Sequence, residues 1–181
     1  MSEALQALYE GDVERARALL PPDKELSVFE AAAFGRVERL RSLLAADPSL
    51  AQARADDGFT ALHLAVFGRQ ADAARALLEQ GADGEALSQG AIAHVRPLGT
   101  AAFVRSTELA RLLLDAGADP NGRAGDGSTP LHTAASNGDL ELLELLLERG
   151  AAPLANDAGV TPRDLAADSG VLARLDRRST S

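Results

Sequence analysis

A few histidines and acids are the side chains of this chain best suited to chemistry. They are His63, His94, His132, Asp56, Asp57 and Asp126. An imidazole titrates near neutral pH, where it can act as a general base or as a metal ligand. Neighbouring carboxylates are the usual ligands of hard cations. The question is whether the spacing of these residues favours such chemistry.

His63 and His132 recur at one position of two similar segments. Both follow a leucine in similar segments, ALHLAV and PLHTAA. The same position in other repeats of the chain is assigned to Phe29, Gly99 and Asp164, so no row of metal ligands forms.

The remaining candidates lie in predicted loops. His94 stands near Arg96, and we interpret it as a solvated loop histidine rather than a ligand or a base. Asp56, Asp57 and Asp126 fall at predicted hairpin tips. Turn chemistry alone accounts for aspartate there, although coordination of a cation or pairing with a charged partner is the alternative.

The composition removes several further kinds of chemistry. A chain without cysteine forms no disulfide, thiolate nucleophile or cysteine-based zinc site. It also lacks a Gly-rich phosphate loop ending in Lys-Ser/Thr, a G-x-S-x-G segment and a paired metal-binding helix motif. We therefore expect no catalytic residue, no metal and no cofactor.

Charge and hydropathy bear on the class of partner and on the cellular location of the protein. A formal net charge of −9 and a pI near 4.8 disfavour nucleic acid as the main partner. No run approaches 18 apolar residues, and the acidic N-terminal segment is unlike a signal peptide, so we expect a cytoplasmic protein without a membrane span. Lys24 is the only lysine, and alanine and leucine abound, which is typical of a GC-rich bacterial genome.

Four similar segments must position these residues. TALHLAVFGR begins at Thr60, RPLGTAAFVR at Arg96, TPLHTAASNG at Thr129 and TPRDLAADSG at Thr161. Their spacings are 36, 33 and 32 residues. Self-similarity near 33 residues indicates a stacked helical solenoid.

Each repeat is predicted to hold two helices. The first is short and rich in alanine, at 29–34, 61–67, 98–104 and 131–136. The second is amphipathic, at 13–20, 37–44, 71–78, 107–114 and 140–147. Gly11, Gly35 and Gly138 precede second helices, where the reversing chain needs a positive φ. Arg69 and Arg105 stand in the matching place, so we expect those turns to be less relaxed or differently shaped.

The motif T-P-L-H-x-A-A-x-x-G followed by L-L-x-x-G-A-D-x-N resembles the ankyrin repeat, most closely at 129–150. The resemblance implies an all-α ankyrin-repeat solenoid of stacked helix-turn-helix pairs with hairpin loops. It also implies that the motif histidine hydrogen-bonds neighbouring backbone and steadies the hairpins. We expect one domain over 1–181, made of an N-terminal capping helix pair, internal repeats, and a C-terminal cap and tail whose second helix is truncated. The ranges are 1–25, then 26–59, 60–95, 96–128 and 129–160, then 161–181.

The same resemblance implies protein–protein recognition through a concave surface of hairpins and first helices. The residues expected to bind the partner are Asp56, Asp57, Phe59, Phe67, Ile92, Val95, Phe103, Asp126, Ser128 and Ser136. Phe59, Phe67, Val95 and Phe103 would form an apolar centre with acidic residues at its edge. The partner is then a protein with basic rim residues, and the chain itself is expected to be a monomer.

Two other functions are left open. The hairpin at 84–96 is longer than its equivalents, so an enzyme or metal-dependent regulator would have its site there. A self-associating scaffold is the third possibility. Metal analysis tests the first of these alternatives, and the mass in solution tests the second.

Overall fold

A computed structural model describes residues 1–90 and 94–178. The chain forms two compact units, unit 1 over Met1–Ala93 and unit 2 over His94–Ser181. Ile92, one of the expected binding residues, lies outside the described residues. None of the described helices is long and apolar enough to cross a membrane.

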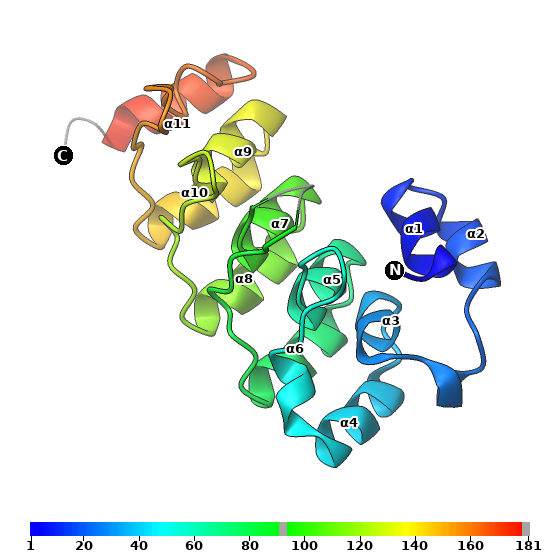
Figure 1. Cartoon of the computed structure of the whole chain (residues 1–181). Coiled ribbons are helices and arrows are strands. Elements are labelled where there is room, and N and C mark those ends of the chain that lie inside the picture. Colours follow the sequence, from blue (N-terminus) through cyan, green and yellow to red (C-terminus); the bar gives the residue numbers. More distant parts are fainter. Residues whose placement is uncertain (91–93, 179–181) are drawn as a thin grey trace. The chain divides into compact units, whose positions relative to one another are not determined.

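Unit 1 is built from paired helices (Figure 1). The pairs are α1 (Glu3–Tyr9) with α2 (Val13–Ala18), α3 (Val28–Ala33) with α4 (Val37–Ala46), and α5 (Ala61–Phe67) with α6 (Ala71–Glu79). Two short 3₁₀ helices, η1 (Asp23–Glu25) and η2 (Pro48–Ala51), lie in the connections. First helix α5 packs on α3 and second helix α6 packs on α4, so these repeats stack pair on pair.

Unit 2 repeats the arrangement. Its pairs are α7 (Pro97–Phe103) with α8 (Thr107–Asp115) and α9 (Pro130–Asn137) with α10 (Leu140–Glu148), followed by α11 (Ser169–Arg178). Helix α9 packs on α7, while α10 packs on both α8 and α11. The helices predicted from the sequence agree with the observed bounds to within two residues. The all-α fold is therefore confirmed.

Small residues on the first helices let neighbouring repeats approach closely. Ala32 and Ala65 are fully buried in unit 1, as are Ala101 and Ala134 in unit 2. The second helices supply larger side chains, and α10 buries a row of leucines along its inner face. Each fully buried leucine contributes about 1.5–3 kcal/mol of hydrophobic stabilisation.

The turns between the paired helices all use a left-handed residue. Gly35 and Gly138 both have a φ of 66° at this position. Arg69 and Arg105 adopt nearly the same conformation, with φ of 58° and 55°. The expectation of a differently shaped turn is therefore wrong. The turn is the same but strained, because a side chain in this region costs roughly 1–2 kcal/mol.

The C-terminal end differs from the sequence prediction. The second helix of the last repeat is not truncated, because α11 continues over ten residues. Val171 and Leu175, one turn apart on α11, are both buried, which anchors the helix on unit 2. The shortened element is the first helix, since the segment after Thr161 forms only a turn. Arg163 on that turn holds α11 through Asp176, with Nε 2.9 Å from Oδ1.

Candidate protein-binding surface

At four repeat starts, the third residue after a Ser or Thr has one shared role. Its side chain accepts a hydrogen bond from the backbone N–H of that capping residue, which orders the start of the repeat. The pairs are Ser27 N to Glu30 at 3.0 Å, Thr60 N to His63 at 3.4 Å, Thr129 N to His132 at 3.0 Å and Thr161 N to Asp164 at 2.8 Å. Because carboxylates and imidazoles perform the same task, the role of the two histidines is structural.

The structure differs from the sequence prediction at the start of α3. Phe29 was assigned to the histidine position, but α3 begins at Val28, so Glu30 is its third residue. Gly99 does occupy the position in α7, and the capping residue there is Arg96, without a side-chain cap.

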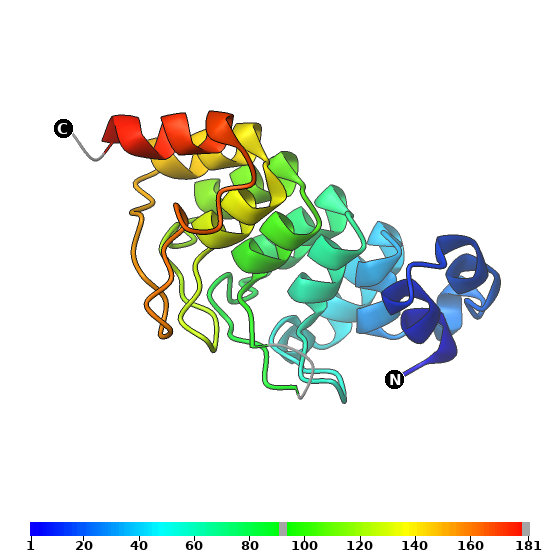
Figure 2. The same cartoon turned by 90° about the horizontal axis from the view of Figure 1, so that it is seen from above.

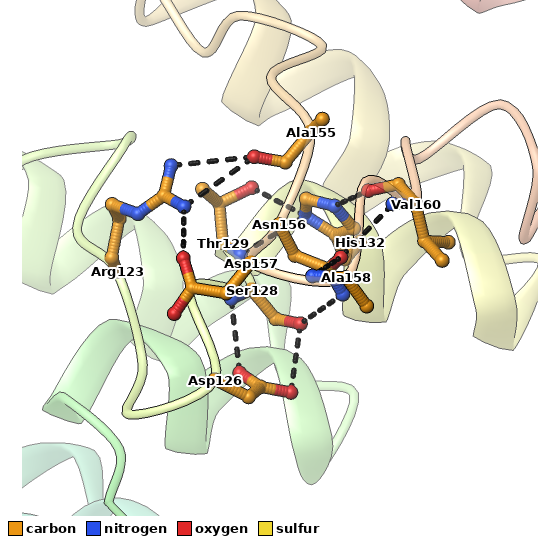
Figure 3. Close-up of polar contacts among 10 residues, drawn as sticks. All are labelled: Arg123, Asp126, Ser128, Thr129, His132, Ala155, Asn156, Asp157, Ala158 and Val160. Carbon is orange, nitrogen blue, oxygen red and sulfur yellow. Dashed lines mark hydrogen bonds and ion pairs between the residues drawn. The ribbon is translucent and has the colours of Figure 1, made fainter.

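His132 shows why such a residue is unsuited to catalysis. Its side chain is only 2% exposed. Nδ1 accepts from Thr129 N, so the ring proton lies on Nε2, which donates to the Val160 backbone oxygen at 3.0 Å (Figure 3). Both ring nitrogens are therefore occupied by backbone groups of two successive hairpins. His63, 1% exposed, makes the equivalent contacts with Thr60.

The hairpin tip of unit 2 brings together two expected binding residues, Asp126 and Ser128. Asp126 Oδ1 accepts from the Ser128 backbone N–H at 2.9 Å, and Oδ2 accepts from the Ser128 hydroxyl at 3.0 Å (Figure 3). The backbone N–H of Ser128 is the main reason that the pKa of the Asp126 carboxyl lies below its usual value. The carboxylate therefore stays charged at neutral pH while it shapes the turn.

Two neighbouring hairpins of unit 2 lie side by side (Figure 2). The backbone N–H of Asp157 donates to the Asp126 backbone oxygen at 3.1 Å. Arg123 joins the hairpins further, because its Nη2 lies 2.9 Å from Asp157 Oδ1 and it also donates to the Ala155 backbone oxygen (Figure 3). The sequence analysis missed this contact.

The position of Arg123 in its repeat could have predicted this contact. Arg54 precedes Thr60 by the same interval as Arg123 precedes Thr129, and Arg54 likewise bridges hairpins through the Gly58 and Leu87 backbone oxygens. Arginine at this position therefore acts between hairpins in both units.

The surface that we call the unit 2 surface consists of Phe103, Asp126, Ser128 and Ser136. Phe103 ends α7 and is 66% exposed, while Ser136 occupies the same position on the adjacent α9 and is also exposed. The hairpin residues lead directly into α9, and Ser136 lies about 9 Å further along that helix. Val95, expected at the same surface, is half-buried. His94 is exposed, and its backbone oxygen accepts from Gly125 N at 2.8 Å.

The surface that we call the unit 1 surface consists of Asp57, Phe59 and Phe67, and it is covered. The Tyr9 ring lies edge-on to Phe67 at a centroid distance of 5.2 Å and is tilted against Phe59 at 6.1 Å. The Tyr9 hydroxyl donates to Asp57 Oδ2 at 2.8 Å. Phe59 and Phe67 are half-buried and pack against the hydrophobic core of unit 1.

Sequence reasoning missed Tyr9, because its contacts reach residues about 50 positions away. The acids of this hairpin are also engaged within the chain. The Met1 amine lies 2.8 Å from Asp56 Oδ2, while Asp57 Oδ1 accepts from Phe59 N at 3.1 Å. Among the described residues, histidines and acids do not gather into a group of three or more able to hold a metal ion.

Stacked pairs of short helices, joined by left-handed turns and by hairpins that contact their neighbours, form a helical repeat protein. Family models agree: one for ankyrin repeats in three copies matches residues 2–88, and one for ankyrin repeats in many copies matches 97–166. The chain belongs to the ankyrin repeat family. A comparison with curated proteins found no match.

Ankyrin repeats are in general protein–protein interaction modules and are typically not catalytic. This general role agrees with the way the histidines and acids of the chain are used. The polar atoms of His63, His132 and Asp126 hold two helix starts and a hairpin in place.

Proposed function

We propose that the protein binds a partner protein through the unit 2 surface, with Phe103 as its main apolar contact. The observation that carries this proposal is the exposure of Phe103, 66% for a large apolar side chain at the end of a first helix. Aromatic residues, phenylalanine included, are enriched at the cores of protein interfaces. Phe67 occupies the equivalent position on α5, but there the ring packs under Tyr9.

The edge of this surface is acidic. Asp126 is exposed and, because its pKa is lowered by Ser128, it is ionised at neutral pH. Together with the net charge of −9, this favours a partner with basic residues around an apolar contact. The association rate should then fall as salt is added, because salt screens the attraction that steers the partner.

The test is capture of a partner by the immobilised chain from an extract of the source cell, followed by a measured affinity for the partner identified. Phe103→Ala should weaken binding by about 1–2 kcal/mol, roughly a factor of 5–30. It should unfold like the wild type, because the ring is mostly outside the core.

The matched control is Arg111→Glu, an exposed position on the second helix α8 of the same unit. It should leave the affinity unchanged. The proposal is wrong if Arg111→Glu abolishes binding while Phe103→Ala binds normally. Mass in solution tests the accompanying proposal that the chain is a monomer, and localisation in the source cell tests the proposed cytoplasmic location.

A further inference from the structure

The first helix pair does not stack like the others. In a regular solenoid each repeat contacts only its neighbours. Helix α1 packs on α3, as a neighbour should, but its last residue, Tyr9, also reaches Phe67 at the end of α5, together with Asp57 and Phe59 in the hairpin that leads into α5. The N-terminal pair therefore lies over the surface of the repeat beyond its neighbour.

Tyr9 covers two positions of the repeat in unit 1 whose equivalents in unit 2 are exposed. Phe67 and Phe103 occupy the same position of the repeat, and Asp57 and Asp126 occupy the same position of the hairpin. In unit 2 the aromatic ring is exposed and the aspartate is at an open hairpin tip. In unit 1 one side chain, Tyr9, contacts both.

Tyr9 contacts the unit 1 surface in the way that a side chain of a bound partner would. Its ring packs against two aromatic rings, and its hydroxyl donates to a carboxylate at 2.8 Å. Burial, and then the Asp57 carboxylate, raise the pKa of the Tyr9 phenol, so the hydroxyl remains a donor at any physiological pH. A hydrogen bond to a charged acceptor is stronger than one between neutral groups.

The N-terminal pair is attached to unit 1 mainly through α1, whose Leu5, Ala7 and Leu8 are buried in a core cluster with Ala33 and Leu64. Helix α1 has seven residues and α2 has six, and α2 buries only Ala16. The connection that follows contains Pro21, Pro22 and η1, which has no buried residue. Helices this short are unstable in water on their own. The pair should therefore unfold when it leaves the rest of unit 1, in a local opening that α5 and α6 do not share.

We propose that the N-terminal helix pair is a lid, closed by Tyr9 over the unit 1 surface. The lid opens by local unfolding, and a partner that offers an aromatic ring with a hydrogen-bond donor to Asp57 replaces Tyr9. The role of the partner rests on the proposed function, whereas the existence and chemistry of the lid do not.

Hydrogen exchange in the intact chain tests the opening. Amides of α1 and α2 should exchange at least about tenfold faster than those of α5 and α6 under native conditions. Tyr9→Phe removes only the hydroxyl and should speed exchange in α1 and α2 by about tenfold. Tyr9→Ala should speed it further, and both variants should leave α5 and α6 protected.

Arg15→Ala is the matched control, because Arg15 lies on α2 and its Nη1 pairs with the exposed Glu10 at 3.1 Å, away from the contacts of Tyr9. It should leave exchange nearly unchanged. The lid is refuted if α1 and α2 exchange together with α5 and α6, or if Tyr9→Phe exchanges at the wild-type rate.

Chemical rescue tests the recognition. In the Tyr9→Ala chain, 4-methylphenol should bind where the phenol was removed and slow exchange in α1 and α2. Toluene, which lacks the hydroxyl, should bind at least about fivefold more weakly because it makes no hydrogen bond to Asp57. Equal binding of the two probes, or equal binding of 4-methylphenol to the wild type, would overturn the assignment. Neither experiment uses a partner, so a failure of the Phe103 test would leave these results intact.

Discussion

Replacement of His132 by alanine should be among the most damaging changes in unit 2. The substitution leaves the buried Thr129 N–H without the Nδ1 acceptor that lies 3.0 Å away. An unsatisfied buried donor costs about 1–3 kcal/mol. It also removes the bond from Nε2 to the Val160 backbone oxygen, worth about 0.5–1.5 kcal/mol. We expect a loss of about 2–4 kcal/mol in the free energy of unfolding.

A second variant separates the two contributions. His132→Asn retains an oxygen near the position of Nδ1, so it can still accept from Thr129, but its side chain is too short to reach Val160. We expect it to lose about half as much stability as His132→Ala. Asp164 already shows that a short side chain can accept from the capping residue, at 2.8 Å from Thr161 N.

Urea unfolding followed by circular dichroism measures both losses. Thermal unfolding gives a second measurement, because in a chain of this size each kcal/mol lost from the free energy of unfolding lowers the melting temperature by about 2–4 °C. If His132→Ala unfolds at the same urea concentration as the wild type, the structural role of the histidine is refuted. If the asparagine variant is as unstable as the alanine variant, the bond to Thr129 is not the larger contribution.

Other positions give independent tests. Arg105→Gly should stabilise the chain by about 1 kcal/mol, because its φ of 55° strains any side chain; a lower melting temperature would contradict this. Gly58→Ala should cost at least about 2 kcal/mol more than Gly159→Ala, as measured by urea unfolding. Their φ values, 82° and 79°, are nearly equal, but only at Gly58 would a Cβ meet backbone, 2.2 Å from Gly90 N. The pKa of Asp126 is lowered in the folded chain, so its contribution to stability is present above the ordinary value of 3.8 and is lost as pH falls from there through the lowered pKa of the folded chain. In Ser128→Ala, NMR titration should still find the pKa of Asp126 below its usual value, because the backbone N–H remains.

The helices and their order could be predicted from the sequence because the information is local. The small residues on each first helix and the leucines at three- and four-residue steps on each second helix determine which helix faces pack. Both patterns can be recognised in any segment of about 30 residues. The structural role of His63 and His132 was predicted from the resemblance to the ankyrin repeat, and the contact is local, since the donor and the acceptor lie three residues apart.

Features that depend on distant residues were not predictable. Tyr9 meets Asp57 and Phe67 only because the first helix pair leaves the regular stack, and no local pattern encodes that departure. The length of α11 was underestimated because its burial comes from α10 rather than from its own composition. All of the binding residues remain predictions, and the structure adds that Phe103, Asp126 and Ser136 are exposed.

The shared position after each capping residue has a consequence for how such chains change over time. Glutamate, histidine and aspartate all fill it, and one repeat manages with glycine. Duplicated repeats can therefore exchange one acceptor side chain for another at the residue by which their motif is usually recognised, while the path of the backbone is kept. A descendant of this chain can replace the histidines of its T-A-L-H and T-P-L-H segments by acidic residues and still stack its hairpins in the same order.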